Sequence, residues 1–357
     1  MNKDSKIYIA GHLGMVGSAI HRNLVNKAYH NFILKNIDEL DLSNQNDVAA
    51  FFEKEKPEYV VLAAAKVGGI VANNTYRAQF IYENIQIQNN IIHHSYLNGV
   101  KKLLFLGSSC IYPKNCPQPI KEDYLLTNEL EYTNEPYAIA KIAGIKMSES
   151  YNLQYGCNFI SVMPTNLYGP NDNYNLETSH VLPALIRKIY LGKCLMGNNW
   201  EAIRKDLNLR PIEKVSGLNS KEEILEKLNH FGIQNDQTTS IELWGTGNPL
   251  REFMYAEDLA DACVFLMENI DFADLSKNKP VINTHINIGT GVDLTISELA
   301  NMIKQMIGFE GNIVWNAAKP DGTYRKLLDV SKLHSLGWKH NTSLEEGLKK
   351  VYQAYIA

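Results

Sequence analysis

Cysteine is scarce in this chain of 357 residues, and the few cysteines form no pattern. The five cysteines are an odd number, are scattered, and include no Cys-x-x-Cys pair. These absences argue against a disulfide framework and a cysteine-based zinc site, and they favour a reducing compartment. The chain also lacks a signal-like N-terminal segment and any apolar run near the roughly eighteen residues that span a membrane. We therefore expect a cytoplasmic protein with no metal and no membrane partner.

A strong excess of charge is missing as well. The formal net charge is −4, with 21% charged residues. This balance gives no electrostatic reason to expect nucleic acid as a partner. The hydrophobic content of 45% is typical of a globular protein. The length allows one or two domains.

The N-terminal region has the pattern of a dinucleotide-binding turn. A short apolar run at 6–10 is followed by G-x-x-G-x-x-G at Gly11, Gly14 and Gly17, and a helical pattern covers 18–27. Glycines at this spacing allow a tight turn and close approach of the backbone to a pyrophosphate, which meets the unpaired N–H groups of the helix. A plain glycine-rich turn is the alternative. The strand–turn–helix context favours a nucleotide cofactor.

The next apolar run, 31–35, is expected to end near the adenine ribose of the cofactor. It ends on Lys35, and we take Asp38 as the first acid after it. NAD-binding sites usually place a carboxylate there for the 2′-hydroxyl, whereas a cation suits a 2′-phosphate. The sequence thus favours NADP(H) over NAD(H), although Lys35 can equally be a solvated surface lysine.

The first half of the chain alternates apolar runs with helical patterns. Further apolar runs lie at 59–63, 102–108 and 158–163, and helical stretches cover 77–98 and 137–155. This alternation predicts an α/β fold, a Rossmann-like doubly wound parallel sheet with helices on both faces.

The pattern changes near residue 170, which suggests a second lobe. We expect an NADP-binding domain at 1–170, to which the chain returns near 240–265, and a smaller C-terminal α/β substrate lobe at 171–357. Within that lobe a polar segment, 198–239, is read as an irregular insertion with one amphipathic helix at 221–231. The substrate is expected in the cleft between the two lobes.

Tyr137 and Lys141 form the most informative pair in the sequence. Residues four apart lie on one face of a helix, so the ammonium is expected beside the phenol. Such a charge lowers the pKa of a tyrosine and suits it to exchange a proton with a carbonyl or carbinol oxygen. Ser108 ends the run 102–108 and can hold the same oxygen.

Taken together, these motifs resemble the extended short-chain dehydrogenase/reductases. The segment 164–170 supports the same resemblance. Within that group the chain is similar to the GDP-L-fucose synthase family, through the segments at 10–20, 107–113, 179–183, 244–253 and 319–323. The resemblance covers nearly the whole chain apart from about 198–239. That family epimerises GDP-4-keto-6-deoxymannose at C3 and C5 and then reduces C4 with NADPH.

The resemblance implies a role for each matching residue. Tyr137 is the acid that protonates O4, Lys141 tunes it and holds the nicotinamide ribose, and Ser108 hydrogen-bonds the sugar carbonyl. Cys110 and His180 match by position the pair that the family uses for epimerisation. A thiol and an imidazole suit this chemistry, since both titrate near neutral pH. Taken alone, Cys110 reads as a buried thiol and His180 as a hydrogen-bonding residue at a helix start.

The resemblance also implies two sets of binding residues, with no metal among them. The expected NADP(H) site consists of Gly11, Gly14, Met15, Val16, Gly17, Lys35, Ala63, Ala64, Ala65, Leu106, Gly107, Tyr137, Lys141, Pro164, Asn166, Leu167 and His180, with Asn166 in a loop beside the nicotinamide. The expected site for the GDP-linked 4-keto sugar consists of Ser109, Lys188, Trp244, Arg251 and Asp321.

The sequence departs from the family pattern in places that affect specificity. Leu13 and Ile37 stand where the family has arginines near the adenosine phosphate, so NADPH preference would depend on Lys35 and its neighbours. Lys188 replaces an arginine at the diphosphate and keeps the charge without the planar fork. The insertion at 198–239 either enlarges the sugar pocket, for example for a GDP-heptose, or decorates the surface.

The resemblance further implies a homodimer that pairs the helices 77–98 and 137–155 across a two-fold axis into a four-helix bundle. These stretches carry apolar residues that can serve such an interface or pack on their own sheet, namely Ile81, Ile85, Ile92 and Ile145.

Other activities remain open. A nucleotide-sugar 4-epimerase or a 4,6-dehydratase would use the same fold, but dehydratases place an Asp-Glu pair where this chain has Ser109 and Cys110. A non-catalytic NADP sensor can lose the catalytic tyrosine and lysine, and this chain retains Tyr137 and Lys141. Residue identity does not decide whether Cys110 and His180 epimerise the sugar or only position it.

Overall fold

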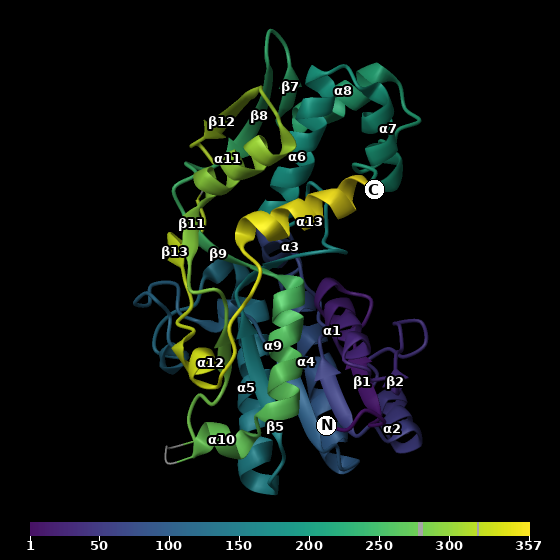
Figure 1. The fold of residues 1–357 in the computed structure, drawn as a ribbon, viewed down its shortest axis with the longest axis vertical. Coiled ribbons are helices and arrows are strands. Elements are labelled where there is room, and N and C mark those ends of the chain that lie inside the picture. The colour runs from purple at the N-terminus through teal and green to yellow at the C-terminus, as the bar shows by residue number, and fades with distance from the viewer. Residues whose placement is uncertain (278–280, 320) are drawn as a thin grey trace. The chain divides into compact units, whose positions relative to one another are not determined.

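The computed structural model describes residues 1–277, 281–319 and 321–357. The chain forms two compact units (Figure 1). Unit 1 consists of Met1–Asn171, Glu252–Val292 and Leu327–Leu344, and unit 2 of Asp172–Arg251, Asp293–Lys326 and Glu345–Ala357. The sequence had suggested a division near 170 and one return near 240–265. The structure has two returns, and the second, Leu327–Leu344, was not foreseen.

Unit 1 is built on a six-stranded sheet in the order β10-β5-β4-β3-β1-β2. Every neighbouring pair is parallel, as the alternation of strands and helices predicted. The order reverses between β1 and β3, and ligands of such sheets bind beyond the carboxyl ends of the strands at this point. The strands are β1 (Ile7–Ala10), β2 (Phe32–Ile33), β3 (Tyr59–Leu62), β4 (Lys102–Leu106), β5 (Phe159–Pro164) and β10 (Ile286–Ile288).

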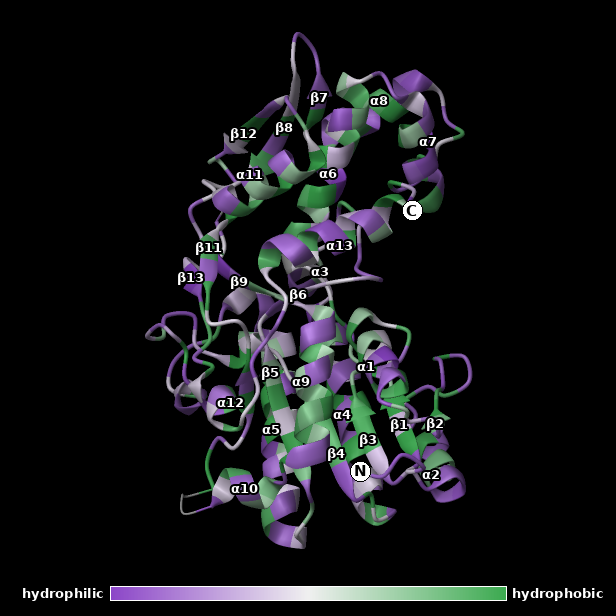
Figure 2. Cartoon of the chain, in the orientation of Figure 1, coloured by the Kyte–Doolittle hydropathy of each residue, from purple (hydrophilic) through white to green (hydrophobic). Residues whose placement is uncertain are grey.

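Helices cover both faces of this sheet (Figure 1). Alternate side chains of β1 point to opposite faces of the sheet, and both faces are apolar. Ile7 and Ile9 pack in one apolar cluster, and Tyr8 and Ala10 pack in the other. The first cluster contains α1 (Met15–Asn26) and α9 (Ala256–Asn269), and the second contains α2 (Gln45–Glu55), α4 (Arg77–Leu97) and α5 (Glu135–Tyr155). Hydrophobic residues dominate these strands (Figure 2).

The second cluster decides between the two roles that the sequence left open for two isoleucines of α4 and α5, a dimer interface or packing on their own sheet. Ile92 and Ile145 are 0% and 1% exposed and belong to the core of unit 1, so neither is available to a partner. They point inward because α4 and α5 pack on the sheet through the same faces. Ile81 and Ile85 are partly exposed.

Short elements complete unit 1. They are α3 (Ile70–Thr75), β6 (Asn166–Tyr168), α10 (Phe272–Ser276), α12 (Ser331–Ser335) and the 3-10 turns η1 (Ser109–Ile111), η2 (Glu122–Tyr124) and η3 (Tyr132–Asn134). β6 pairs in parallel with Phe253–Tyr255 of β9 (Leu250–Tyr255). Asn166 therefore lies in a strand, where a loop had been predicted.

Unit 2 has its own three-stranded sheet in the order β12-β8-β7. The strands are β7 (Ile233–Asn235), β8 (Thr239–Trp244) and β12 (Asn312–Asn316), while β11 (Asp293–Thr295) and β13 (Arg325–Lys326) flank the start of β9. Its helices are α6 (Val181–Met196), α7 (Trp200–Leu209), α8 (Lys221–His230), α11 (Ile296–Ile307) and α13 (Leu344–Ile356).

The segment 198–239 is more regular than the sequence suggested. Besides the predicted helix, now α8, it contains α7 and the strand β7. α7 was missed, although Asn199 caps it by accepting a hydrogen bond from the N–H of Ala202 at 3.0 Å. The buried face of α7 contains Asp206 beside Ile203 and Leu207, and this acid interrupts the apolar stripe in the sequence.

Candidate active site

The glycine-rich turn of unit 1 has the geometry of a pyrophosphate cradle. Gly11 has a φ of +86°, and a Cβ added to Gly17 would lie 2.1 Å from the carbonyl oxygen of Gly11. Gly14 caps α1 without any side-chain hydrogen bond, and Met15 and Val16 begin the helix. The first N–H groups of α1 are therefore available to an anion beside a backbone that side chains do not crowd.

The other predicted cofactor residues lie where neighbouring strands of the same sheet end. Ala63, Ala64 and Ala65 follow β3, and a Cβ on Gly11 would approach the nitrogen of Ala64 to 2.7 Å. Leu106 ends β4 and Gly107 follows it, while Pro164 ends β5. Asn166 and Leu167 lie in β6, and the Asn166 amide donates to the carbonyl of Glu252 at 2.8 Å. The residues of unit 1 thus fit a dinucleotide along this edge.

Lys35 is not the isolated cation that the sequence suggested. Its Nζ lies 3.0 Å from Oε1 of Glu39, and Glu39 also accepts from the N–H of Asn36. These hydrogen bonds, that of Asn36 first, hold the pKa of Glu39 below its ordinary value. The sequence analysis considered Asp38 as the first acid and overlooked Glu39, four residues after Lys35.

Ser108, Tyr137, Lys141 and Cys110 come together in unit 1. The side chain of Ser108 hydrogen-bonds that of Tyr137, and Cys110 is close enough to both Tyr137 and Lys141 to affect their titration. The Lys141 ammonium is 5.8 Å from the centroid of the Tyr137 ring. A hydroxyl, a phenol, an amine and a thiol therefore lie close together at the carboxyl end of β4.

The pKa of Tyr137 is shifted in the direction opposite to the prediction. Burial raises the pKa of Tyr137 above its ordinary value, and the hydrogen bond from Ser108 opposes this only in part. Lys141 does not reach the phenol, because its Nζ donates to the carbonyl of Leu106 at 2.8 Å. Burial lowers the pKa of Lys141 to about 8. The tyrosine is therefore held as a protonated phenol, the form that donates a proton.

Cys110 sits in η1, the turn that follows Ser108. It is 7% exposed, and its N–H donates to Oγ of Ser108 at 3.3 Å. Ser109, predicted to contact the substrate, is buried in the same turn.

The remaining predicted residues lie in unit 2. His180 caps α6, is solvent-accessible, and nevertheless has its pKa lowered by desolvation. Lys188 on α6 donates to the carbonyl of Glu242 at 3.2 Å, and burial lowers the pKa of Lys188 to about 8. Trp244 is 58% exposed, and Nζ of Lys319 lies 5.1 Å from its ring centroid.

Arg251 and Asp321 are neighbours in unit 2, and their charges interact. The Asp321 carboxylate accepts from the N–H of Thr246 at 2.9 Å and from its hydroxyl at 2.7 Å. Thr246, which lies between two glycines of the segment 244–253, was not predicted as a site residue. Pro320, within the motif 319–323, lies outside the described residues.

Glu252 is a second residue that sequence reasoning missed. Its carboxylate is 0% exposed and accepts from the N–H groups of Thr290, Gly291 and Leu328 at 2.5, 2.7 and 3.1 Å. Because these donors follow β10 and begin the second return, Glu252 fixes two distant segments of unit 1 beside Asn166.

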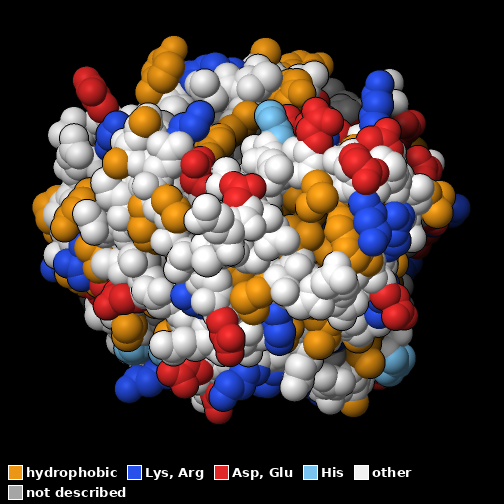
Figure 3. Space-filling model, turned by 90° about the horizontal axis from the view of Figure 1, so that it is seen from above, with side chains coloured by type: hydrophobic (Ala, Val, Ile, Leu, Met, Phe, Trp, Pro, Cys, Tyr) orange, Lys and Arg blue, Asp and Glu red, His pale blue; other side chains and the backbone are white. Residues whose placement is uncertain are grey.

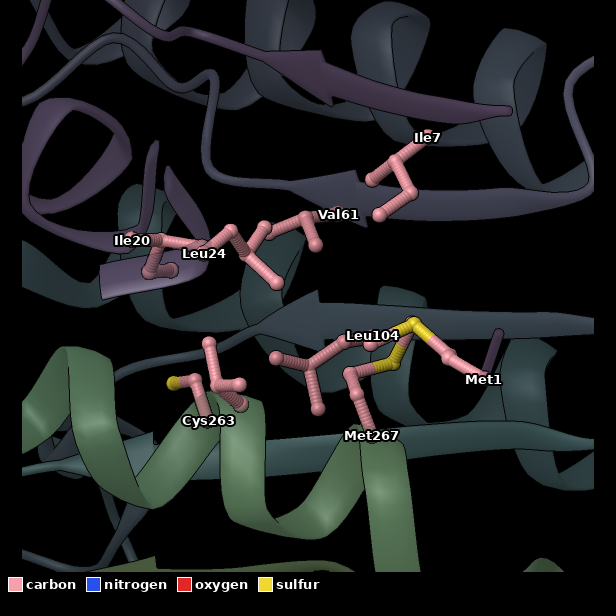
Figure 4. Close-up of a pocket in the computed structure, with 9 residues that line it drawn as sticks. Met1, Ile7, Ile20, Leu24, Val61, Leu104, Cys263 and Met267 are labelled. Atoms are coloured by element: carbon pink, nitrogen blue, oxygen red, sulfur yellow. The ribbon is translucent and has the colours of Figure 1, made fainter. Parts of the chain in front are cut away.

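The internal void in Figure 4 does not belong to the site. It measures about 10 Å³ and is lined only by apolar residues of unit 1, among them Ile7, Leu24, Val61, Leu104 and Cys263. A void this small, without a polar lining, is unsuited to a cofactor. Across the described residues, no three His, Cys, Asp or Glu side chains cluster as metal ligands would.

A parallel doubly wound sheet, a glycine-rich β–α turn and a Ser–Tyr–Lys group at the strand ends define an extended short-chain dehydrogenase/reductase. The family comparison agrees, because residues 7–207 and 206–289 match the model of the NAD dependent epimerase/dehydratase family. The chain belongs to this family.

Within it, the chain belongs with the GDP-L-fucose synthases and related GDP-sugar enzymes. It is 51% identical to GDP-L-fucose synthase 1 of Arabidopsis thaliana, over 99% of this chain and 94% of that protein. A GDP-6-OMe-4-keto-L-xylo-heptose reductase from Campylobacter jejuni is 50% identical, with a TM-score of 0.93 over 99% of this chain and 98% of that one.

A GDP-D-glycero-L-gluco-heptose synthase from Campylobacter jejuni, solved in the presence of NADPH, is 49% identical, with a TM-score of 0.92 over 100% of both chains. With these relatives and the fold described above, the protein is an NADP(H)-dependent oxidoreductase of nucleotide sugars.

Proposed function

We propose that this protein reduces C4 of a GDP-linked 4-keto-6-deoxy sugar, hexose or heptose, with NADPH. The observation that carries the proposal is the meeting of Ser108, Tyr137 and Lys141 at the end of β4, in a chain whose relatives are named as GDP-sugar synthases and reductases. When bound, NADPH supplies the hydride for C4.

Tyr137 donates the proton that O4 needs. Its raised pKa keeps the phenol protonated at neutral pH, so the proton is present when charge develops on O4. Ser108, already hydrogen-bonded to Tyr137, orients the same oxygen. With a pKa of about 8, Lys141 is largely protonated near neutral pH. Its charge lies 5.8 Å from the centroid of the Tyr137 ring and favours the phenolate that remains through space, without a hydrogen bond to it.

The GDP moiety is assigned to residues of unit 2. Arg251 offers a planar, charged fork to the diphosphate, and Lys188 adds a point charge. Trp244 provides an exposed aromatic surface for a base, and Asp321, held by Thr246, accepts from hydroxyl groups. Lys and Arg side chains lie among Asp and Glu side chains over the face in Figure 3.

Epimerisation at C3 and C5 is proposed for Cys110 and His180. The 4-keto group acidifies the neighbouring C–H bonds, and inversion needs an acid and a base on opposite faces of the ring. Both side chains titrate near neutrality in their ordinary state, which suits proton exchange with carbon.

The segment 198–239 is proposed to adapt the protein to a sugar larger than a hexose. Two Campylobacter jejuni relatives are named for GDP-heptoses. α7 is also joined to α6, the helix of Lys188, by a buried ion pair.

We further propose that the protein is a cytoplasmic homodimer. The structure joins none of its five cysteines in a disulfide, which suits a reducing compartment. Over the described residues, the structure contains no helix with both the length and the apolar character that crossing a bilayer takes. The dimer would pair α4 and α5, whose exposed faces retain apolar residues such as Tyr82 and Ile139.

The test is a paired turnover assay in D2O with NADPH. The GDP-linked 4-keto-6-deoxy hexose and heptose are supplied separately, NADPH oxidation is followed, and products are examined by NMR. Tyr137→Phe should lower kcat by about 100-fold or more while NADPH still binds. Failure of the wild type to oxidise NADPH or NADH with either ketone would overturn the proposal.

The same experiment decides two finer points. Deuterium at C3 or C5 that disappears in Cys110→Ser identifies Cys110 as an epimerising residue. Reduction without deuterium makes the protein a dedicated C4 reductase. A higher kcat/KM for the heptose would connect the segment 198–239 to substrate size, and a preference for the hexose would contradict that connection.

A further inference from the structure

Tyr112 joins the turn that carries Cys110 to a distant strand. Its hydroxyl donates to Oδ1 of Asn287 at 2.5 Å and lies 3.0 Å from Nε2 of His285. Tyr112 is 3% exposed, and both partners are 0% exposed. None of these three residues has a part in the reaction described above. Their contacts lie entirely within unit 1.

The protons in this group follow from its geometry. Because the hydroxyl hydrogen of Tyr112 is used toward Asn287, Nε2 of His285 must carry the hydrogen that the phenol oxygen accepts. The other ring nitrogen, Nδ1, has no hydrogen-bond partner, and burial lowers the pKa of His285 to about 3. His285 is thus neutral, and the phenol of Tyr112 receives a hydrogen bond as well as giving one.

Three further hydrogen bonds fix the position of Asn287. Its amide nitrogen donates to the carbonyls of Ile120 at 2.9 Å and Asp329 at 3.2 Å, and its backbone N–H donates to Glu122 at 3.0 Å. It lies in β10, opposite Met163 of β5. The oxygen that Tyr112 meets is therefore part of the rigid sheet and not of a loop.

The turn itself is held weakly by its own backbone. Ser108 receives the N–H of Cys110 at 3.3 Å on its hydroxyl and the N–H of Ile111 at 3.3 Å on its carbonyl, and the N–H of Tyr112 reaches Ser109 at 3.5 Å. All three distances are at the long end for N–H···O bonds. Ile111 packs in the apolar core of unit 1, and the phenol of Tyr112 adds a hydrogen-bonded attachment to β10.

We propose that Tyr112 is a positioning residue that holds the Ser108–Cys110 turn against the sugar through its hydrogen bonds to Asn287 and His285. The inference rests on the proposed function, since it concerns the same Ser108 and Cys110. A displacement of about 1 Å in such groups costs as much as 100-fold in rate. Loss of the hydroxyl also leaves the buried oxygen of Asn287 unsatisfied.

The test compares Tyr112→Phe with Tyr8→Phe in the full-length protein. Tyr8 is an ideal control because it is 0% exposed, lies in β1 of the same unit, and has a hydroxyl without a hydrogen-bond partner. For Tyr112→Phe we expect kcat for ketone reduction to fall by about 10- to 100-fold, with KM for NADPH within about twofold of wild type. Tyr8→Phe should match the wild type in both.

Two further measurements separate positioning from general damage. Asn287→Leu should lower kcat at least as much as Tyr112→Phe, because it also removes the hydrogen bonds to Ile120 and Asp329. The double variant should be no worse than Asn287→Leu alone, because the bond between Tyr112 and Asn287 is then already lost. The rate at which iodoacetamide alkylates Cys110, located by mass spectrometry, should rise several-fold in Tyr112→Phe and stay unchanged in Tyr8→Phe.

The alkylation rate keeps the two proposals distinguishable. If the wild type reduces no ketone while Tyr112→Phe still raises the alkylation rate of Cys110, the proposed function is wrong, and the inference that Tyr112 fixes the position of the turn is retained. If Tyr112→Phe loses thermal stability but keeps wild-type kcat and alkylation rate, Tyr112 is only structural and the inference is overturned. Additive effects of Tyr112→Phe and Asn287→Leu would also overturn it.

Discussion

The ammonium of Lys35 lies 3.0 Å from the carboxylate of Glu39, so the cation at the tip of the second strand already has an anionic neighbour. In the proposed site, Lys35 meets the 2′-phosphate of NADPH. Glu39 would then weaken this attraction and would itself suit the free 2′-hydroxyl of NADH. Two adjacent side chains thus favour opposite cofactors.

Glu39→Gln should therefore raise the preference for NADPH over NADH. We expect the ratio of the two kcat/KM values to increase by about two- to fivefold, the range typical of exposed charge pairs. Lys35→Gln should lower the same ratio. Glu53→Gln, which removes an exposed acid from α2, is the control. Equal ratios for Glu39→Gln and Glu53→Gln would show that Glu39 does not affect the phosphate site.

Lys141 should make stability depend on pH above neutrality. Burial lowers its pKa in the folded protein to about 8 from an ordinary value of 10.5. The unfolded chain therefore binds the proton more tightly between these values, and the folded state gains stability as pH rises through this window. The difference corresponds to roughly 3 kcal/mol.

The measurement compares melting temperatures of the wild type and Lys141→Met between pH 7 and pH 10.5. The melting temperature of the wild type should rise relative to that of the variant as pH rises, because Lys141→Met has no buried charge to neutralise. Subtraction cancels the titration of all other groups. Lys54→Met controls for loss of an exposed lysine. A difference that stays constant across the range would mean that the Lys141 amine is well solvated.

The ion pair between Arg187 and Asp206 makes α7 essential to unit 2. Arg187 is 0% exposed, and its Nε donates to Asp206 at 3.0 Å and its Nη1 to the carbonyl of Tyr174 at 3.0 Å. Arg210 adds a second contact to Asp206 at 3.2 Å. Removal of Asp206 leaves a fully buried guanidinium without its anion.

Asp206→Asn should consequently destabilise the protein by about 3 to 5 kcal/mol. Thermal or denaturant unfolding of the full-length chain measures the loss, and Glu226→Gln on the exposed side of α8 is the control. The double variant Arg187→Met with Asp206→Leu should recover much of the stability, since it removes both charges together. A single variant as stable as the wild type would contradict a structural role for this pair.

The sequence predicted features that depend on neighbouring residues and missed those that depend on distant ones. The turn at Gly11, Gly14 and Gly17 is local, and so is the order of strands and helices that follows from alternation. The helix α7 was missed because Asp206 interrupts its apolar face, and the reason for that acid is Arg187, nineteen positions earlier in the chain.

The candidate catalytic group shows the same limit. Spacing correctly placed Tyr137 and Lys141 on one helix. The direction in which the pKa of Tyr137 is shifted depends first on burial, which spacing does not show. Thr246 and Glu252 were not recognised because their partners, Asp321 and Gly291, follow them at a distance of many residues. Glu39, by contrast, could have been found from its four-residue spacing to Lys35.

The proposed dimer gives a further test, with a different set of residues from the one that the sequence suggested. Ile92 and Ile145 are in the core of unit 1, whereas Tyr82 on α4 and Ile139 on α5 are 63% and 41% exposed. A charge at these positions would be buried without a partner at an α4–α5 interface. The double variant Tyr82→Glu with Ile139→Glu should therefore be monomeric.

Light scattering after size-exclusion chromatography measures the mass directly at micromolar concentration. Leu218→Glu is the matched control, because Leu218 is 87% exposed and lies in the segment 198–239, away from both helices in sequence. The wild type and Leu218→Glu should have the mass of a dimer. A dimeric double variant would place the interface on another face, since two carboxylates facing their own copies across a two-fold axis are not compatible with a packed apolar contact.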